Sequence, residues 1–373
     1  MSTPSRALAL HFAPPSAFAS DINLRVRAAL RNDARCRFAT ASQWWSAALV
    51  LALSATAYAA LLSRVISPFV ASWCVVAVGF GIFMTIAQVG HDAAHGVLSS
   101  KPWLNRLVVF VVFALAGIDG ALWRDRHIRL HHQFVNLPGT GIDADSVKLL
   151  RLAPDKPWRW WHRFQPFYAP LFYMCGHMGL AWIEDFASLH AARKTGRRNF
   201  MRWRAIVIFA AGKIIHAVLF LLLPLWLLRP SLLTLGLSYA LASGVFAICF
   251  VILVVGTHVS DLAAFPLPDC DGRIPHDWAT HQVMTAVDWA PTRPVAAMLC
   301  GGANAHLAHH LFPGFAHCHL AWLSQIIVVA VVDHRLQHRV TSFAGMILAQ
   351  WRHLVVLSRP PVDKAGKELD FIF

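Results

Sequence analysis

The sequence predicts an all-α integral membrane protein, with four transmembrane helices in two hairpins and a helical cap on the cytosolic side. Of its 373 residues, 57% are hydrophobic and only 14% are charged. Soluble domains hold about 45–50% apolar and about 25% charged residues. The hydrophobic residues also gather into long runs, whereas a soluble protein spreads them over amphipathic periods. A lipid bilayer is therefore the predicted environment for much of the chain.

Four apolar runs are long enough to cross a bilayer, since about 20 helical residues span a hydrocarbon core of about 30 Å. The runs cover Trp45–Ile66, Phe69–Gly90, Ala205–Leu228 and Ser231–Gly256. Two-residue links join the members of each pair, namely Ser67 with Pro68 and Arg229 with Pro230. Because such links leave no room for another element, each pair is predicted to form a hairpin. Residues 44–357 would then be one membrane domain, between a cytosolic segment (1–43) and a C-terminal tail (358–373).

The positive charges predict the orientation of the spans. The net charge is +14, and the cations include Arg25, Arg27, Arg31, Arg35, Arg37 and the run 193–198. If the chain starts in the cytosol, everything except the two short links is cytosolic, as the positive-inside rule requires. Cations beside spans favour lipid headgroups or an acidic protein as partners, not nucleic acid. The alanine and arginine content suggests the inner membrane of a bacterium, and we expect no cleavable signal peptide at the start.

Two shorter apolar runs, Leu107–Ile118 and Leu323–Val332, hold about a dozen residues or fewer. They are too short to span and are predicted to lie in the membrane interface or dip into it.

The seven cysteines are scattered without a CxxC pair, and several lie inside apolar stretches. We expect them to be buried small hydrophobic residues, not disulfides or zinc ligands.

Eight of the 21 histidines form three clusters just outside an apolar run. They are HDAAHG (91–96), HIRLHH (127–132) and HLAHH (306–310). Positions i and i+3 or i+4 share a helix face, so each cluster presents two or three imidazoles in one direction. A single pair is equally compatible with hydrogen-bonded core histidines. Three clusters on the same predicted side of the membrane indicate a metal site with the ligands His91, His95, His127, His131, His132, His306, His309 and His310.

Eight imidazoles imply two metal ions, because a structural zinc takes four ligands and a catalytic zinc takes about three plus water. Imidazole also suits iron, copper and nickel. A nitrogen-rich site of this size fits iron and dioxygen chemistry better than zinc hydrolysis, although ligand counting leaves a dizinc site open.

The segments HDAAHG, HIRLHHQFVNLPGTGIDAD and GGANAHLAHHLFPG resemble, in order and spacing, the three histidine boxes of the membrane fatty acid desaturase family. The resemblance covers about Trp45 to Leu357. It implies a cytosolic cap that holds two irons at the mouth of a narrow apolar tunnel, with the eight box histidines as ligands. It adds a ninth ligand, His258, just after the fourth span. Some members hold a metal through an asparagine one turn earlier, where this chain has Val254. We leave His281 outside the metal shell.

Ligating imidazoles usually donate their second N–H to a carboxylate or carbonyl. Asp92, Asn136 and Asp143 are the candidates for these outer contacts, together with Asp145 and Asp185. Lys213 and His216 lie one turn apart inside the third span, where ionisable groups are costly and usually functional. We expect these two residues to line the region under the metal site, although Lys213 could instead extend toward the cytosolic end of the span.

The resemblance implies oxygen-dependent desaturation of a fatty acyl chain, with two iron ions as cofactor and O2 as co-substrate. The acyl group would be carried by a lipid, by coenzyme A or by acyl carrier protein. No flavin, nicotinamide, iron–sulfur or haem signature is present, so a separate ferredoxin or cytochrome b5-like protein would donate electrons. A hydroxylase, ketolase or acetylenase of the same diiron type is an alternative. A non-enzymatic membrane metal-binding protein is a further one, although a transporter would place its ligands at mid-membrane and not beyond the span ends.

Overall fold

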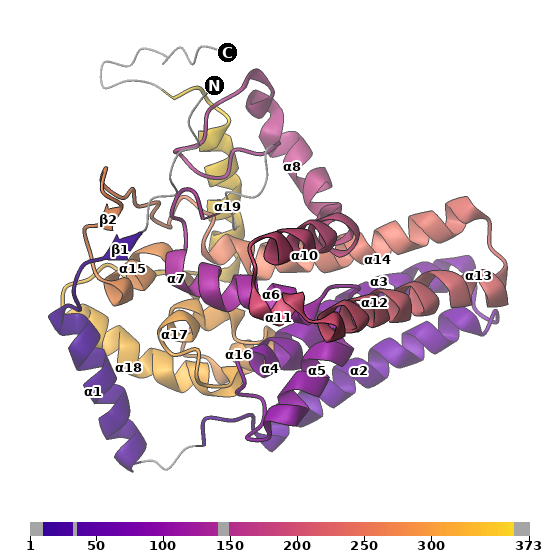
Figure 1. The fold of residues 1–373 in the computed structure, drawn as a ribbon, viewed down its shortest axis with the longest axis horizontal. Coiled ribbons are helices and arrows are strands. Elements are labelled where there is room, and N and C mark those ends of the chain that lie inside the picture. Colours follow the sequence, from indigo (N-terminus) through magenta and orange to yellow (C-terminus); the bar gives the residue numbers. More distant parts are fainter. Residues whose placement is uncertain (1–9, 33–35, 141–148, 362–373) are drawn as a thin grey trace.

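The computed structural model describes residues 10–32, 36–140 and 149–361 and is almost entirely helical. These residues contain four helices that are long and apolar enough to cross a membrane: Ala41–Leu62, Pro68–Ala94, Trp203–Leu228 and Leu232–Thr257. The four predicted spans are confirmed, with ends shifted by up to four residues. They extend to one side of the molecule, and the remaining helices gather at the other end (Figure 1).

The first two spans lie side by side. They are α2 (Ala41–Leu62) and α3 (Pro68–Thr85), which a π-helical turn (Ile86–Gly90) continues into α4 (His91–Ala94). The Ser67 hydroxyl begins α3 by accepting a hydrogen bond from the Val70 amide. The helix is therefore capped where the chain reverses.

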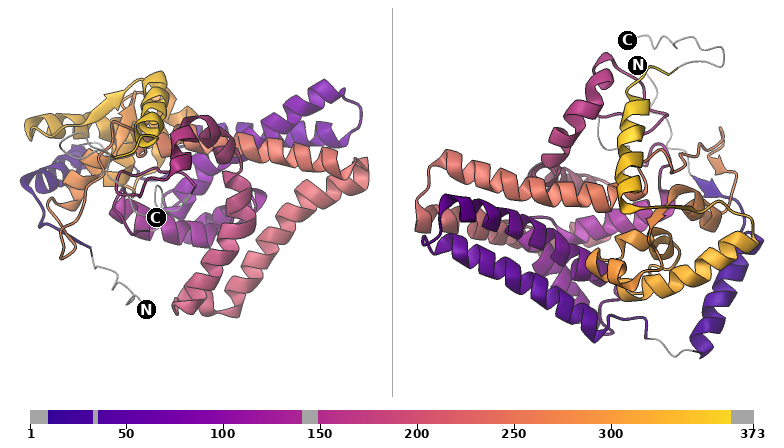
Figure 2. Two further views of the ribbon diagram at one scale, coloured as in Figure 1. Left: turned by 90° about the horizontal axis from the view of Figure 1, so that it is seen from above. Right: turned by 180° about the vertical axis from the view of Figure 1, so that it is seen from behind.

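The last two spans diverge. The third consists of α12 (Trp203–Ala217), a π-helical turn (Val218–Leu222) and α13 (Leu223–Leu228), and the fourth is α14 (Leu232–Leu253), followed by a 3-10 turn (Val255–Thr257). They open from their link like a V, because α14 packs along α3 while α12 packs along α5 (Figure 2). A Cβ on Gly79 of α3 would lie 2.3 Å from the Ala242 oxygen of α14. Only glycine allows the two helices to approach this closely.

The predicted short apolar run Leu107–Ile118 forms most of a helix that ends in a sharp bend. It falls in α5 (Pro102–Leu115), and the chain then bends by 105° into the helix Gly120–Phe134, made of α6 (Gly120–Arg126), a π-helical turn (His127–His131) and α7 (His132–Phe134). This bend directs the second histidine cluster away from the spans.

Helices from the middle of the chain connect the bend to the third span. In order, they are a 3-10 turn (Trp160–Phe164), α8 (Gln165–Met174), α9 (Gly176–Gly179), a π-helical turn (Leu180–Glu184), α10 (Asp185–Lys194) and α11 (Arg198–Met201). Of these, α8 and α9 pack on α14.

The rest of the chain, with α1 (Ala17–Asn32), forms a region that we call the cap. It contains α15 (Trp278–Thr285), α16 (Pro294–Leu299), α17 (His306–Leu311), α18 (Leu320–Asp333) and α19 (Phe343–Leu357), with 3-10 turns at 303–305 and 317–319. Two parallel strand pairs complete it: β1 (His11–Phe12) with β2 (Arg273–Ile274), and β3 (Val287–Trp289) with β4 (Arg339–Thr341).

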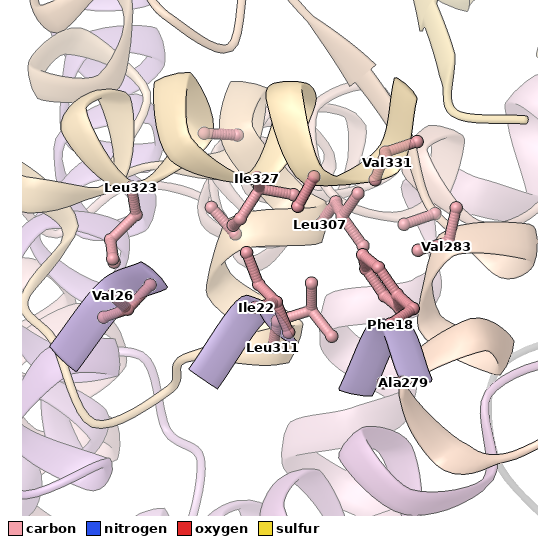
Figure 3. Packing of buried hydrophobic residues seen from close by; sticks show 14 of the residues in the cluster. Phe18, Ile22, Val26, Ala279, Val283, Leu307, Leu311, Leu323, Ile327 and Val331 are labelled. Atoms are coloured by element: carbon pink, nitrogen blue, oxygen red, sulfur yellow. The ribbon is translucent and has the colours of Figure 1, made fainter. Parts of the chain in front are cut away.

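An apolar core holds the cap together (Figure 3). Phe18, Ile22 and Val26 of α1 face Leu323 and Ile327 of α18. One face of the second short apolar run, 323–332, packs in this protein core, whereas Val329 and Val332 are 53% and 68% exposed. Its predicted place in or near the membrane interface stays a prediction.

The prediction that the cysteines are buried is wrong. All seven are free, Cys36, Cys175 and Cys270 are exposed, and the other four are partly buried. The absence of disulfides among them agrees with the scattered spacing.

Candidate metal centre

The histidines of the three clusters converge on one buried site at the end of the spans. His91, His95, His127 and His309 offer ring nitrogens that all lie within 4.8 Å of one another. The Nε2 atom of His127 lies 3.1 Å from that of His91 and 3.0 Å from that of His95. These four imidazoles, which we call the first group, come from all three clusters.

The second group lies next to the first and is more deeply buried. It consists of His131, His258, His306 and His310, whose ring nitrogens also lie within 4.8 Å of one another. The Nε2 atom of His258 lies 3.0 Å from that of His310 and 2.7 Å from that of His306. His258, expected from the resemblance alone, therefore joins the box histidines.

His132 lies between the two groups. Its Nε2 atom is 3.1 Å from that of His127, and its ring stacks on His310 with the centroids 4.4 Å apart. Its ring also meets His309 edge to face, at 4.6 Å. All nine histidines that we expected to ligate metal thus come together.

π-Helical turns interrupt the helices that carry the first two clusters and change the direction of the histidine side chains. A π-helical turn directly precedes His91, and another contains His127 and His131. Such a turn inserts one residue into the helix and rotates the side chains that follow, and it is frequent at functional sites. The sequence pattern gave no sign of these turns.

The chemistry of the nitrogens fits bound metal. Burial, with the neighbouring imidazoles, holds the pKa of His95, His306, His309 and His310 well below the ordinary value. These rings are therefore neutral near pH 7 and keep a lone pair for a metal ion. The Nε2 atom of His309 is buried without a hydrogen-bond partner among the described residues. Two sets of four imidazoles, the second buried and the first partly buried, suit two transition-metal ions.

Helix α15 orients two rings of the second group. The Nδ1 atom of His310 donates to the side-chain oxygen of Gln282, and that of His258 donates to the Thr285 carbonyl, both at 2.8 Å. Since these acceptors carry no proton, each ring keeps its hydrogen on Nδ1 and directs Nε2 into the group. Gln282 was missed in the sequence. Its one visible signal is that Gln282 and Thr285 lie on a common face of α15.

Asp92 lies beside the first group as expected, but its main partner is another histidine. One carboxylate oxygen accepts hydrogen bonds from Gln43 Nε2 (2.8 Å) and from His317 N and Nδ1 (both 3.0 Å). The other oxygen is 3.6 Å from Nδ1 of His91. Asp92 therefore ties α2 and the segment after α17 to the first histidine cluster, and His317 is a contact that sequence reasoning missed.

The other expected residues divide between the centre and places outside it. Asn136 donates to the carbonyls of His258 (2.9 Å) and Ala264 (3.0 Å), so it holds backbone beside the second group. His281 uses both ring nitrogens elsewhere, on Val135 O and His276, which agrees with its exclusion. Asp143 and Asp145 lie outside the described residues.

Three expected residues lie away from the histidine groups. Lys213 and His216 bind the turn between α5 and α6, and Asp185 pairs with Lys213 at 2.8 Å. They therefore do not provide outer contacts to the metal groups. The ammonium group of Lys213 is buried and hydrogen-bonded within the protein, and its extension toward the cytosolic end of the span stays a prediction.

A groove of about 1010 Å³ runs beside the centre, between α5, α6, α11 and α12. Ala93, Gly96 and Ile128, which are sequence neighbours of His95 and His127, form part of its wall. Its lining combines apolar side chains, among them Val109, Phe110, Ile208 and Phe209, with the arginines Arg37, Arg106, Arg124, Arg129, Arg202 and Arg204. The groove is suited to an amphipathic anion.

Comparison with known proteins agrees with the resemblance of the histidine clusters to those of fatty acid desaturases. The sequence model of the fatty acid desaturase family matches residues 67–342. The chain is 29% identical over 301 residues to sn-1 linoleoyl-lipid 6-desaturase of Arthrospira platensis, covering 79% of this chain and 80% of that protein. It is 27% identical over 293 residues to the Synechocystis sp. protein of the same name (73% and 76% covered) and 27% identical over 334 residues to acyl-lipid (8-3)-desaturase of Mortierella alpina (86% and 73%). With its apolar helices and clustered histidines, this chain belongs to the fatty acid desaturase family, and it is an integral membrane oxidoreductase.

Proposed function

We propose that the chain introduces a C=C bond into a fatty acyl chain at a centre of two iron ions. The observation that carries this proposal is the pair of four-histidine groups in a chain of the desaturase family. In the balanced reaction, a –CH2–CH2– unit, one O2, two electrons and two protons give –CH=CH– and two waters. Two iron ions would supply the activation of O2 and the removal of hydrogen from unactivated carbon, which no side-chain acid or base can achieve.

The first group (His91, His95, His127 and His309) would hold one ion, and the second (His131, His258, His306 and His310) the other, with His132 available between them. The chain's own part is to aim these rings and, by burial, to keep His95, His306, His309 and His310 neutral. Gln282, the Thr285 carbonyl and Asn136 support the second group, and Asp92 supports the first. These contacts hold ligand rings against other elements of the protein, which favours a preorganised site.

The groove supports an acyl substrate with an anionic headgroup. An acyl chain would bury its methylenes against Val109 and Phe110, and a phosphate group would pair with arginines such as Arg202 and Arg204. A phospholipid, an acyl-CoA and an acyl carrier protein all carry such a phosphate. The relatives named acyl-lipid or linoleoyl-lipid desaturases favour the lipid. Binding in a fixed position would select the carbon pair that reacts.

For the membrane arrangement, we infer two hairpins with both termini and the metal centre in the cytosol, in the inner membrane of a bacterium. The domain division 1–43, 44–357 and 358–373 belongs to this proposal. Arginine-rich segments outside the two links support the orientation. A separate ferredoxin or cytochrome b5-like protein would supply the two electrons, and the basic surface would suit an acidic donor.

The test is expression in a bacterial host, with mass spectrometry of total acyl chains for the wild type, His309→Ala and the control His190→Ala. His190 is an exposed histidine outside both groups. We expect species two mass units lighter with the wild type and the control, and none with His309→Ala. Products heavier by about sixteen mass units would show that the enzyme hydroxylates the acyl chain and does not desaturate it. If no product forms, the iron content of the purified protein decides: about two atoms per chain keep the metal proposal, and none removes it.

A further inference from the structure

Three side chains from outside α5 donate to three consecutive carbonyl groups at its end. His216 Nδ1 lies 2.9 Å from the Leu115 oxygen, His177 Nε2 lies 2.7 Å from the Ala116 oxygen, and Lys213 Nζ lies 2.5 Å from the Gly117 oxygen. The three donors are at most 7% exposed. Residues 115–117 form the turn between α5 and α6, where the chain bends by 105°.

These carbonyls need partners that the helix does not provide. The last carbonyls of a helix have no intrahelical donor, and a buried carbonyl without a partner is costly. Backbone amides satisfy the two preceding ones, because Ile118 N donates to Phe113 O and Gly117 N donates to Ala114 O. Side chains satisfy the next three. Backbone amides therefore donate to the carbonyls of residues 113 and 114, and side chains distant in sequence donate to those of residues 115–117.

Two of the three donors, His216 and Lys213, are themselves held in place by further hydrogen bonds. Trp182 donates to the Tyr239 hydroxyl, which donates to His216 Nε2, so that His216 keeps its hydrogen on Nδ1. The ammonium group of Lys213 also donates to the Ala181 carbonyl and to Asp185. All three of its donor positions are therefore used inside the protein.

The turn is coupled to the second histidine cluster. The Asp185 oxygen that accepts from Lys213 also accepts from the Asp119 amide at 2.6 Å. Asp119 in turn caps α6 through a 2.8 Å bond from the Leu122 amide. Trp123, the residue after Leu122, stacks on His127 with the centroids 4.4 Å apart. The direction in which α6 leaves the turn therefore sets the position of His127.

A change at the turn would reach both metal groups at once. The helix that starts at residue 120 carries His127 of the first group and His131 of the second, with His132 between them. A rotation of this helix would move these three rings away from those of the first and third clusters.

We propose that Lys213, His177 and His216 are positioning residues for the metal centre: by capping residues 115–117 they fix the bend that brings the second histidine cluster between the other two. The inference rests on the proposed metal function. It assigns a role to three polar residues that do not touch the histidine groups.

The experiment compares variants that remove each donor with variants that keep one. Lys213→Met, His177→Leu and His216→Leu remove it, whereas His177→Gln and His216→Gln retain an N–H. Ile214→Ala is the control on the same span, because Ile214 is 61% exposed and faces away from the turn's donors. Two quantities are measured on the purified full chain: iron retained against a chelator, and hydrogen exchange of the backbone segment 115–134.

We expect the donor-removing variants to bind iron about 10-fold more weakly, the lower end of the effect of losing a direct contact to a metal ligand, because these residues act on the ligands only through the bend. Exchange should rise in 115–134 and stay unchanged in α2 and α14. The glutamine variants and Ile214→Ala should behave like the wild type. The Gln variants keep the comparison informative if a donor-removing variant fails to fold, because the inference requires them to bind iron normally.

Faster exchange with unchanged iron binding would overturn the positioning role and leave a structural one. Unchanged exchange and unchanged iron in the donor-removing variants would overturn both. A wild type that binds no iron contradicts the proposed function itself, whereas an iron-binding wild type with unaffected variants contradicts only this inference.

Discussion

Single hydrogen bonds decide which nitrogen of His310 and of His258 faces the other histidines of the second group. Gln282 accepts from Nδ1 of His310, and the Thr285 carbonyl accepts from Nδ1 of His258. A backbone carbonyl cannot be removed by substitution, but a glutamine can. Gln282 is therefore the residue at which the orientation of a ligand can be tested without changing the ligand.

For Gln282→Leu we expect iron affinity to fall about 10–100-fold, because His310 loses the acceptor that fixes its tautomer. Gln282→Glu keeps an acceptor at the same position and should retain iron. The measurement is iron per chain after dialysis at increasing chelator concentration. Gln337→Leu, at an exposed position, is the control. Normal iron retention in Gln282→Leu would show that packing alone holds His310.

The turn before α6 requires glycine at one position for two reasons. Gly117 has φ +70°, and an added Cβ would lie 2.7 Å from the His216 ring. Gly139 has φ +78°, but no atom of the described residues lies within 4 Å of the added Cβ. An alanine at either position would strain the backbone, but only an alanine at Gly117 would also clash with a neighbour. Comparing the two substitutions therefore distinguishes backbone strain from steric conflict.

Both Gly→Ala variants should therefore lose stability, with Gly117→Ala losing at least about 2 kcal/mol more than Gly139→Ala. Thermal unfolding in detergent, monitored by circular dichroism, measures the difference. Equal losses at the two positions would mean that His216 moves away without cost, which would also weaken the positioning role of its hydrogen bond.

At the scale of elements, α1 is a structural part of the cap. Its residues Ile22 and Val26 are buried against α18, and the same core includes Leu307 and Leu311 of α17. Since α17 presents His306, His309 and His310 on its other face, this core supports the third histidine cluster from behind.

Replacing Ile22 by alanine should destabilise the cap by about 2–4 kcal/mol, as buried aliphatic truncations do. Leu24→Ala, on the same helix but 63% exposed, should change stability by about 0.5 kcal/mol or less. Thermal unfolding and iron retention are measured together. If Ile22→Ala and Leu24→Ala have the same unfolding temperature and the same iron retention, α1 does not support the cap core.

In the molecule as a whole, the spans and the cap are two connected parts, and the histidine centre lies between them. The four long helices extend from one end, and the centre lies where they meet the cap (Figure 1). We infer that the cap lies outside the bilayer, because its polar and charged side chains would be costly in hydrocarbon. The proposed orientation places it in the cytosol.

A cysteine in the first link tests this orientation. Val65 is 86% exposed, and Cys270 is a naturally exposed cysteine of the cap. With the other cysteines replaced, a membrane-impermeant maleimide added to spheroplasts should label Val65→Cys at once and Cys270 only after permeabilisation. The reverse order would invert the topology, and labelling of both from one side would contradict two complete hairpins.

The sequence by itself determined the parts of the fold that depend on local composition. Four apolar runs predicted the spans because length and hydropathy are properties of contiguous residues. The box histidines were found for a similar reason, since their i, i+3 and i+4 spacing is legible in one dimension. His258 needed the resemblance, because a lone histidine carries no such pattern.

Only the tertiary structure decided how these parts meet. It divided nine histidines from four segments into two groups, with His132 between them, and it opened the last two spans into a V because α14 packs on α3 and α12 on α5. It placed Asp185, expected as an outer contact to the metal, and Lys213 and His216, expected under the metal site, at the turn at 115–117, and it brought Gln282 to His310. The physical reason is that hydrogen-bond partners far apart in the chain are chosen by distance in the folded state, where most buried polar groups find one.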